Sequence, residues 1–323
     1  MELKKKIDNL LMYFKGKDFS YWQLSNGGDT KINLPILGRY FLDFTPMLRE
    51  GHYDKFDQEG IPLRNYGGSV GVRYNPTRIA SYGLGNLDLY LSTGNSAYKE
   101  RFLKQAEWFV KNQKLRKGRI GVWEYNFDWT RGLKAPWISC MAQGQGLSLL
   151  CRAYLLTNDT RFLEIARHAI EAFKSDIEEG GIVSYIKDRF ICFEEYPTNP
   201  PSYTLNGFIF ALVGLYEYYK VTKEKDAQGL FNSGVETLEN CLYLYDTGYW
   251  SRYDLYSDVT IASYSYHNVH IVQLEMLYQL TGKKIFKEYA DKWRRYRESL
   301  FNRFRALILK SLHKLIKFKK EGR

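Results

Sequence analysis

Tyr154-Leu155-Leu156-Thr157 ends an apolar stretch that begins at Met141, and a polar turn at 158–160 follows it. The next stretch, Phe162–Phe173, places apolar residues at intervals of three and four, the spacing of one helix face. An apolar helix, a short polar turn and an amphipathic helix together predict a helical hairpin.

The same Tyr-x-x-Thr pattern occurs four times, each time at the end of an apolar stretch. Its threonines are 64, 65 and 59 residues apart: Thr93, Thr157, Thr222 and Thr281. A single hairpin cannot bury its own apolar face, so repeated hairpins must pack into a stacked or closed array. We therefore predict a mainly α fold, an α/α toroid of about four helical hairpins. The apolar first helices would line the interior and the more charged second helices would lie outside.

The N-terminal part of the chain has a different pattern. Ile32–Phe44 and Ile61–Tyr74 contain strand-forming residues interrupted by Gly, Pro and Asp-rich turns, which predicts a β-hairpin or small sheet. Met1–Phe14 is predicted to form a short helix. The predicted organisation is an N-terminal region at 1–74, a toroid at 75–300 and a basic C-terminal tail at 301–323.

Composition indicates an ordinary globular protein of 323 residues, with 26% charged and 45% hydrophobic residues. Its aromatic share of 16% suits stacking on sugar rings, although a core of large residues explains it equally plainly. The four cysteines lack metal-site spacing and are predicted to be reduced core thiols: Cys140, Cys151, Cys192 and Cys241. Neither a secretion signal nor a membrane-spanning apolar run is present, which predicts a cytoplasmic protein.

The net charge of +11 is concentrated in the tail, since residues 301–323 carry eight basic groups against Glu321 alone. Apolar residues alternate with these basic groups at helical spacing, which predicts a basic amphipathic helix. Such a helix suits peripheral contact with an anionic membrane at the inner face. Docking on the toroid and electrostatic binding of an anionic polymer are the alternatives.

The segments that precede the first helices hold most of the unusual residue combinations. Because the first helices of a toroid run parallel, these segments are expected to gather at one end. Helix N-termini there would attract an anionic ligand. No Walker-type loop or dinucleotide fingerprint occurs, so we predict an anionic carbohydrate and no nucleic-acid partner. The four segments are Tyr74–Arg78, Lys134–Trp137, Glu194–Pro200, and Arg252–Asp254 with Tyr264–His267.

Several motifs stand out in these segments and in the first helices: Glu194-Glu195-Tyr196-Pro197-Thr198, Leu205-Asn206-Gly207-Phe208, Met141–Gly146 with Arg152–Thr157, Leu244–Gly248 with Tyr253-Asp254-Leu255, and Tyr266-His267 with His270-Ile271. Together they resemble the C-terminal catalytic domain of the D-glucuronyl C5-epimerases. They occur in family order and cover roughly residues 60–300.

The resemblance implies an isomerase that inverts C5 of D-glucuronate to L-iduronate in a heparosan-like polysaccharide, without a cofactor or metal. It also implies a homodimer. The catalytic residues implied are Glu195, Tyr196, Tyr253 and Tyr266. The family's Tyr-Asp-Leu motif usually continues with Arg-His, whereas this chain has Tyr256-Ser257.

The chemistry requires a proton-transfer group on each face of the sugar ring and stabilisation of the carbanion formed beside the carboxylate. We assign Glu195 and Tyr266 to opposite sides of C5. Tyr196 and Tyr253 would orient the ring, relay protons or protonate the glycosidic oxygen. Positive surroundings would lower a tyrosine's pKa, and the candidates are helix N-termini, Arg78, Arg252, and His267 or His270.

The predicted substrate-binding residues are Arg78, Tyr82, Trp137, Gln143, Gln145, Asn206, Arg252, His267 and His270. Trp137 suits either a sugar platform or the toroid core. Gln143 and Gln145 are polar within an inward helix, which favours ligand contact. His267 and His270 have a spacing that suits a metal, but no third ligand is evident, so substrate contact or a structural hydrogen bond is expected.

Three other functions fit parts of the pattern. A uronate polysaccharide lyase would abstract the same proton and then eliminate at C4. A glycoside hydrolase would need a carboxylate pair, for which Glu195 with Glu124, Asp128 or Asp254 are candidates. A non-catalytic carbohydrate-binding toroid is the third.

Overall fold

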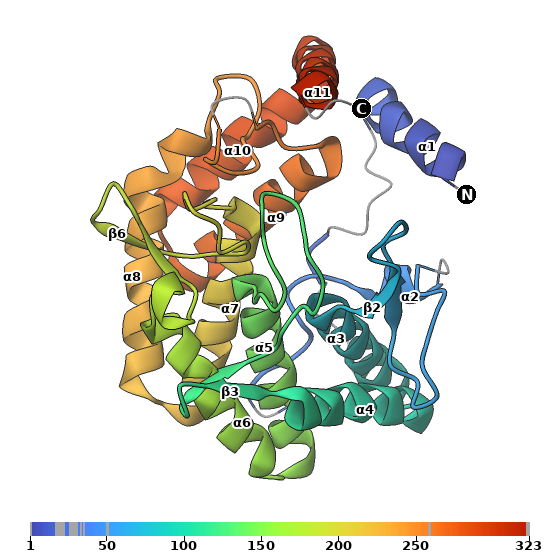
Figure 1. The fold of residues 1–323 in the computed structure, drawn as a ribbon, viewed down its shortest axis with the longest axis vertical. Helices are drawn as coiled ribbons and strands as arrows, with labels where there is room; N and C mark the ends of the chain where they lie inside the picture. The colour runs from blue at the N-terminus through green and yellow to red at the C-terminus, as the bar shows by residue number, and fades with distance from the viewer. Residues whose placement is uncertain are drawn as a thin grey trace. The chain divides into compact units, whose positions relative to one another are not determined.

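The computed structural model describes residues 2–16, 23–25, 32, 34, 36–49, 52–257 and 260–320. These residues are mainly helical, with three short antiparallel hairpins (Figure 1). The helices are α1 (Glu2–Lys15), α2 (Thr45–Arg49), α3 (Pro76–Thr93), α4 (Ser96–Asn112), α5 (Cys140–Thr157), α6 (Arg161–Ile170), α7 (Leu205–Thr222), α8 (Lys225–Cys241), α9 (Tyr264–Thr281), α10 (Lys284–Glu298) and α11 (Leu300–Lys320). The strands are β1 (Leu63–Asn65) with β2 (Val72–Tyr74), β3 (Lys114–Arg116) with β4 (Ile120–Val122), and β5 (Val183–Ile186) with β6 (Phe190–Phe193).

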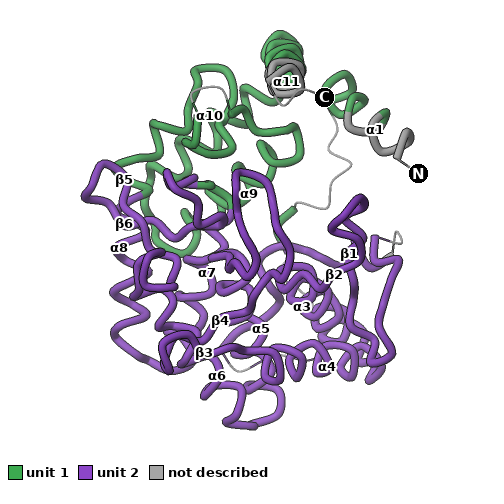
Figure 2. The backbone as a smooth tube through the Cα atoms, in the orientation of Figure 1, with its two compact units in different colours: residues 1–24, 204–206, 238–323 green, residues 25–203, 207–237 purple. Residues whose placement is uncertain are grey.

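Two compact units make up the chain (Figure 2). Unit 1 comprises Met1–Leu24, Thr204–Asn206 and Leu238–Arg323, and unit 2 comprises Ser25–Tyr203 and Gly207–Thr237. Consecutive helix pairs occur in both: α3 packs on α4 and α5 on α6 in unit 2, and α9 packs on α10 in unit 1. The predicted order of helical hairpins is therefore present along the chain.

The Tyr-x-x-Thr pattern marks the end of each first helix. Helices α3, α5, α7 and α9 are each 18 residues long and end at the threonine of the pattern. The tyrosine carbonyl accepts a hydrogen bond from the residue after the threonine, which has a left-handed backbone: Gly94, Asn158, Lys223 and Gly282. This is the geometry that commonly terminates a helix.

The threonine side chain adds a second connection at all four helix ends. In α5, the Thr157 hydroxyl donates to the Ala153 carbonyl at 2.7 Å and accepts from the Asp159 N–H at 3.2 Å. Equivalent pairs of hydrogen bonds form at Thr93, Thr222 and Thr281. One hydroxyl thus joins the last turn of the first helix to the start of the second.

The first helices of unit 2 form its core. Every residue from 142 to 153 of α5 is buried, whereas α4 buries one face through Phe102, Ala106 and Phe109. The backbones of α5 and α7 approach closely at Gly144 and Gly214, since a Cβ on Gly214 would lie 2.5 Å from the Gly144 Cα. The predicted contrast between apolar first helices and amphipathic second helices is confirmed here.

A layer of charged residues crosses the core of unit 2. Asp88, Arg152 and Glu217 each lie five residues before the threonine of their repeat, so they occupy one level of α3, α5 and α7. The Arg152 guanidinium binds both Glu217 oxygens, at 2.6 and 2.7 Å, and all three residues are buried. Burial raises the pKa of Asp88 to about 8, although the Arg152 charge partly offsets this effect.

The prediction for the N-terminal region is partly confirmed. Within Ile61–Tyr74, β1 and β2 form the expected hairpin, and α1 matches the predicted N-terminal helix. The described part of Ile32–Phe44 holds no named strand, so that part of the prediction is wrong. Its described backbone groups bond to separate partners instead of one neighbouring strand. Asp88 accepts from the Tyr40 N–H, Arg152 donates to the Gly38 carbonyl, and the Ser25 N–H donates to the Phe41 carbonyl.

Short hairpins connect the helix pairs of unit 2. The β3–β4 hairpin follows α4 and leads into the loop before α5, and the β5–β6 hairpin follows α6 and ends directly before Glu194. They place the loops that carry the predicted site residues. Among the helices of the described residues, none combines the length and hydropathy needed to cross a membrane.

Candidate functional site

Three of the four predicted segments meet in unit 2, before α3, α5 and α7. Thr77 in the first turn of α3 forms a 2.7 Å hydrogen bond with the Tyr125 hydroxyl. Tyr125 stacks on Trp137, with ring centroids 4.1 Å apart, and the Trp137 and Tyr196 rings are 6.0 Å apart. The convergence of these helix starts, predicted from the repeat, is therefore confirmed within unit 2.

Glu194 holds the loop before α7 in place. Its buried carboxylate accepts hydrogen bonds from the Ser184 hydroxyl, the Ser202 hydroxyl and N–H, and the Tyr203 N–H, at 2.7 to 3.2 Å. Burial raises the pKa of Glu194, and these donors partly offset the rise. Its carbonyl also accepts from the Cys140 N–H, at the start of α5. The sequence hypothesis placed Glu194 in a motif but assigned a role only to its neighbour Glu195, so it missed the positioning role of Glu194.

Glu195 is buried, with 6% of its surface exposed, and lies against the first turn of α7. A Cβ on Gly207 would lie 2.6 Å from the Glu195 Cβ and closer still to Oε2. The glycine thus leaves the space that the carboxylate occupies. The negative charge of Glu195 also adds to the effect of burial, which raises the pKa of Tyr125 far above the usual value for tyrosine.

Aromatic residues at every second position of the loop before α5 pack around Trp137. Tyr125, Phe127, Leu133 and Trp137 pack as one buried cluster, with Tyr66, Trp129 and Tyr196 against it. Trp137 donates from Nε1 to the Phe127 carbonyl at 2.9 Å and is 6% exposed. This geometry favours the core interpretation of Trp137 over a sugar platform. Alternation of Trp123, Tyr125, Phe127 and Trp129 is the signal that would have identified this cluster.

Arg78 and Tyr82, one turn apart on α3, pack against the loop at 52–56. The Arg78 guanidinium lies 4.3 Å from the centre of the Tyr53 ring and donates to the His52 carbonyl. Burial lowers the pKa of Arg78, which nonetheless stays charged at neutral pH because the usual value for arginine is so high. Tyr82 contacts the rings of Tyr53 and Phe56.

Gln143 has a structural role that the sequence hypothesis did not foresee. Its amide accepts from the Trp123 N–H at 3.1 Å and donates to the Gly121 carbonyl at 2.9 Å, and the side chain is fully buried. Both ends of the amide therefore bind backbone in β4 or directly after it. For this reason we assign Gln143 a structural role in place of ligand contact. Gln145 is also fully buried, and its Oε1 accepts from the Ser81 hydroxyl.

In unit 1, Tyr253 and Tyr266 form an aromatic pair at the start of α9. Their ring centroids are 4.8 Å apart at an interplanar angle of 66°. The Ser263 hydroxyl accepts from the Tyr266 N–H and caps the helix, and Tyr266 is 36% exposed. The Tyr253 carbonyl accepts from the Leu205 N–H, while the Asn206 carbonyl accepts from Gln273. Arg252 pairs with Ile261 in an isolated antiparallel β-bridge, and its backbone N–H donates to the Tyr245 carbonyl.

His267 and His270 are fully buried around Ser251. The Ser251 hydroxyl lies 2.8 Å from the His267 Nδ1 and 2.9 Å from the His270 Nδ1, and the His267 ring stacks on Trp250. Burial lowers the pKa of His270 to about 3 and that of His267 well below its usual value. Both rings are therefore neutral at pH 7. The hypothesis that they supply positive charge to a tyrosine is wrong, and their burial favours a structural role over substrate contact.

Two of the carboxylates considered for a hydrolase are engaged by cations in unit 2. Glu124 binds Arg116 at 2.9 Å, and Asp128 binds Lys134 at 2.7 Å. Asp254, in unit 1, is fully buried. Within the described part of the chain, no group of three or more His, Cys, Asp or Glu side chains is placed to hold a metal ion.

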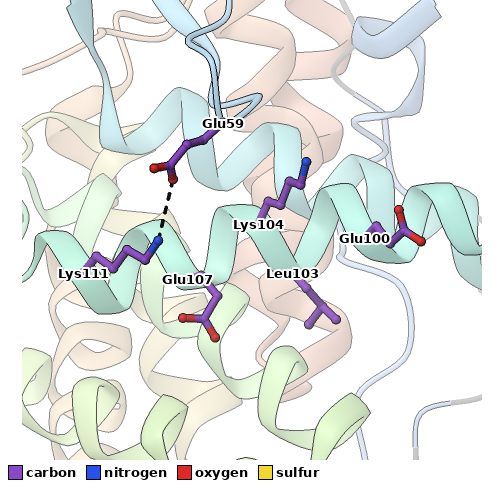
Figure 3. A pocket seen from close by; sticks show the side chains of 6 residues that line it. All are labelled: Glu59, Glu100, Leu103, Lys104, Glu107 and Lys111. Carbon is purple, nitrogen blue, oxygen red and sulfur yellow. Dashed lines mark ion pairs between the residues drawn. The ribbon is translucent and has the colours of Figure 1, made fainter.

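A shallow pocket of about 500 Å³ lies on the outer face of α4, and none of the predicted site residues lines it. In Figure 3 the side chains of Lys111 and Glu59 point toward one another, and their ion pair measures 3.7 Å. Charged, well-exposed side chains of this kind are typical of a solvated helix face. We therefore leave this pocket out of the candidate site.

The model of the family described as D-glucuronyl C5-epimerase C-terminus matches residues 117–295, more than half of the chain. The chain belongs to this family. Eleven of the thirteen predicted site residues lie within the matched range, as does Glu194, whereas Arg78 and Tyr82 precede it.

Two curated relatives show how far the similarity extends. The D-glucuronyl C5-epimerase of Caenorhabditis elegans is 34% identical over 214 residues, which are 61% of this chain and 35% of the worm protein. An uncharacterized protein of Methanocaldococcus jannaschii is 35% identical over 177 residues, 54% of this chain and 57% of that protein. The chain thus spans about a third of the length of the worm protein and just over half of the length of the Methanocaldococcus jannaschii protein.

Solved structures agree with the predicted fold. An alpha-1,6-mannanase, GH76A, from Salegentibacter sp. HEL1_6 has a TM-score of 0.51 at 19% identity and covers 77% of this chain and 68% of its own. An inactive variant of that mannanase in complex with alpha-1,6-mannotriose gives 0.52 at 18% identity, with the same coverage. The prediction of an α/α toroid is confirmed, and at this identity the likeness concerns the fold alone.

Proposed function

We propose that this chain is a polysaccharide epimerase that converts D-glucuronate to L-iduronate at C5. The supporting observation is that the match to the epimerase family covers Glu195, Tyr196, Tyr253 and Tyr266 together. The geometry around Glu195 adds to this support, since a fixed carboxylate at the start of a helix suits proton transfer. Its neighbour Glu194 and Gly207 determine where that carboxylate lies.

In the proposed reaction, one group removes the C5 proton and another returns a proton to the opposite face of the ring. Glu195 and Tyr266 are the proposed proton-transfer groups. Tyr196 and Tyr253 are proposed to orient the sugar, relay protons or protonate the glycosidic oxygen. The carbanion is unstable unless cations or N–H donors stabilise the added charge on the adjacent carboxylate. Because His267 and His270 are neutral, we assign this stabilisation to arginine and to helix N-termini.

The proposed substrate is a heparosan-like chain of glucuronate and N-substituted glucosamine. The name of the worm relative supports D-glucuronate as the reacting sugar. Arg78 and Arg252 are the proposed partners of acidic sugars, because a guanidinium binds a carboxylate with two parallel hydrogen bonds. The homodimer, the cytoplasmic location and the division into three sequence regions stay predictions.

Incubation of heparosan, with and without N-sulfation, in deuterated water tests the proposal directly. Deuterium at C5 of an intact polymer is the expected result, together with iduronate in the disaccharide analysis. Cleavage with an unsaturated product would indicate a lyase, and new reducing ends would indicate a hydrolase. Either outcome, or the absence of exchange with every glucuronan tested, contradicts the proposal.

A matched pair of variants then tests the assignment to Glu195. Glu195→Gln should reduce C5 exchange by about a hundredfold or more, the usual contribution of a proton-transfer group. Glu124→Gln alters a partly exposed carboxylate that binds Arg116 in the same unit, and exchange should stay near the wild-type rate. Equal rates for the two variants would remove Glu195 from the mechanism.

A further inference from the structure

Helix α11 docks on unit 1 through one face. Ala306 is fully buried, and the Lys310 ammonium group donates to the Ile261 carbonyl at 2.9 Å. The Arg305 guanidinium lies 3.8 Å from the centre of the Tyr249 ring, and Arg303 is 7% exposed. These contacts fix which side of the helix faces outward.

The outward face of α11 is apolar. Phe301 is 74% exposed, Ile308 57% and Leu312 48%, and these residues lie with Phe304 at intervals of three and four. A helix that needed only to dock on the protein would carry polar residues on this face. The alternative that the tail simply docks on the protein therefore accounts for one face of α11 and leaves the other unexplained.

Helix α1 extends this apolar face. Ile7, Leu10 and Phe14 are 46 to 51% exposed and lie on one side of α1. The Phe14 and Phe304 rings meet edge to face at 5.1 Å, which joins the exposed residues of these two packed helices. We call this surface the two-helix face; its members are Ile7, Leu10, Phe14, Phe304, Ile308 and Leu312.

Charge indicates what covers the two-helix face. Helix α11 carries seven lysines and arginines and no acidic residue, and α1 carries four lysines against Glu2 and Asp8. The side chains at 313–320 and the residues at 321–323 lie outside what the structure describes. A second copy would bring two strongly basic helices together, which like-charge repulsion opposes. An anionic polymer would satisfy the lysines and leave the aromatic and aliphatic side chains in water.

We propose that α1 and α11 together form a membrane-surface platform, with the two-helix face inserted among the lipids of an anionic bilayer. Exposed aromatic and aliphatic side chains enter the boundary between headgroups and acyl chains, while lysines bind the anionic headgroups. The platform extends the predicted contact of residues 301–323 by a second helix from the other end of the chain. It stands independently of the proposed epimerase activity.

Co-sedimentation of the full chain with vesicles tests the platform. The expected result is binding to phosphatidylcholine vesicles that contain phosphatidylserine, much weaker binding without phosphatidylserine, and loss of binding at high salt. The double variant Phe304→Ser/Ile308→Ser should bind at least about tenfold more weakly, because it removes two inserted side chains. Both positions are exposed, so circular dichroism should be unchanged.

Leu115→Ser is the matched control, since Leu115 is 52% exposed on β3 in unit 2. It should bind vesicles as the wild type does. Absence of wild-type binding, or equal binding by the double variant, overturns the platform. A dimer that the double variant dissociates, without vesicle binding, assigns the face to a second copy instead. If the protein is retained on immobilised heparosan but does not bind vesicles, the basic residues bind an anionic polymer instead of a membrane.

Discussion

The carboxylate of Glu194 accepts hydrogen bonds from both the N–H and the hydroxyl of Ser202, at 3.1 and 2.8 Å, across a loop of seven intervening residues. That loop contains Glu195 and Tyr196, and the Ser202 hydroxyl also lies 3.2 Å from the Tyr196 carbonyl. A buried carboxylate thus closes the segment in which the adjacent carboxylate is the proposed proton-transfer group. The two neighbouring glutamates therefore have separate proposed tasks: Glu194 holds the loop, and Glu195 transfers the proton.

Glu194→Gln is expected to lower the free energy of unfolding by about 2 kcal/mol, because an amide NH₂ would then face N–H donors of the loop. C5 exchange should also fall, since Glu195 and Tyr196 lose their fixed position. Urea unfolding and exchange into heparosan measure the two effects. Glu178→Gln, at an exposed position, is the control and should leave both unchanged. A stable Glu194→Gln protein with full exchange would contradict the positioning role.

Asp88→Asn should change how stability depends on pH. The pKa of Asp88 is raised to about 8 in the folded chain, whereas an unfolded aspartate titrates near pH 4. Between these values the folded state retains a proton that the unfolded state has lost, so stability falls as pH rises. From pH 6 to pH 8 the wild type should lose about 2 kcal/mol relative to Asp88→Asn. Parallel stability curves for the two proteins would show that Asp88 is ionised in the core.

Tyr266→Phe tests the proposed role of a phenol at the start of α9. The variant keeps the aromatic pair with Tyr253 and removes only the hydroxyl of a partly exposed side chain, so the protein should still fold, which circular dichroism checks. C5 exchange should fall by about a hundredfold. Tyr278→Phe is the matched control, since Tyr278 lies on the same helix and is similarly exposed. Wild-type exchange by Tyr266→Phe would exclude this hydroxyl from proton transfer.

Two glycine-to-alanine changes in helices should have opposite effects. Gly214→Ala places a methyl group against the Gly144 backbone in α5 and should destabilise by several kcal/mol, roughly the upper range for overpacking. Gly229→Ala in α8 meets no atom within 4 Å and should stabilise by about 0.5 to 1 kcal/mol through helix propensity. Thermal unfolding distinguishes them. Tolerance of Gly214→Ala would mean that α5 and α7 can separate without loss of the core.

The helix pairs could be predicted because their signals are local. Tyr154 and Thr157 determine a helix end through their own backbone and hydroxyl, so the pattern marks the same end wherever it occurs. Gln143 and His267 were harder, because buried polar side chains look alike in sequence whether they hold a ligand or the backbone. Only the positions of Trp123, Gly121 and Ser251 distinguish the two cases. Ile32–Phe44 has the composition of a strand, but its described partners include side chains of distant helices and single backbone groups such as the Ser25 N–H.

The charged layer in unit 2 makes the repeats individually recognisable. The helix ends are alike in all four copies, yet the residue five positions before each threonine is Asp88, Arg152, Glu217 or Met276. If a copy of the first hairpin replaced the second, an aspartate would stand in place of Arg152. That aspartate would lie at one level with Asp88 and Glu217, and the cation that binds Glu217 would be missing. The hairpins therefore have the same helix ends but different residues at this level of the core, so exchanging the first and second would remove the Arg152–Glu217 pair.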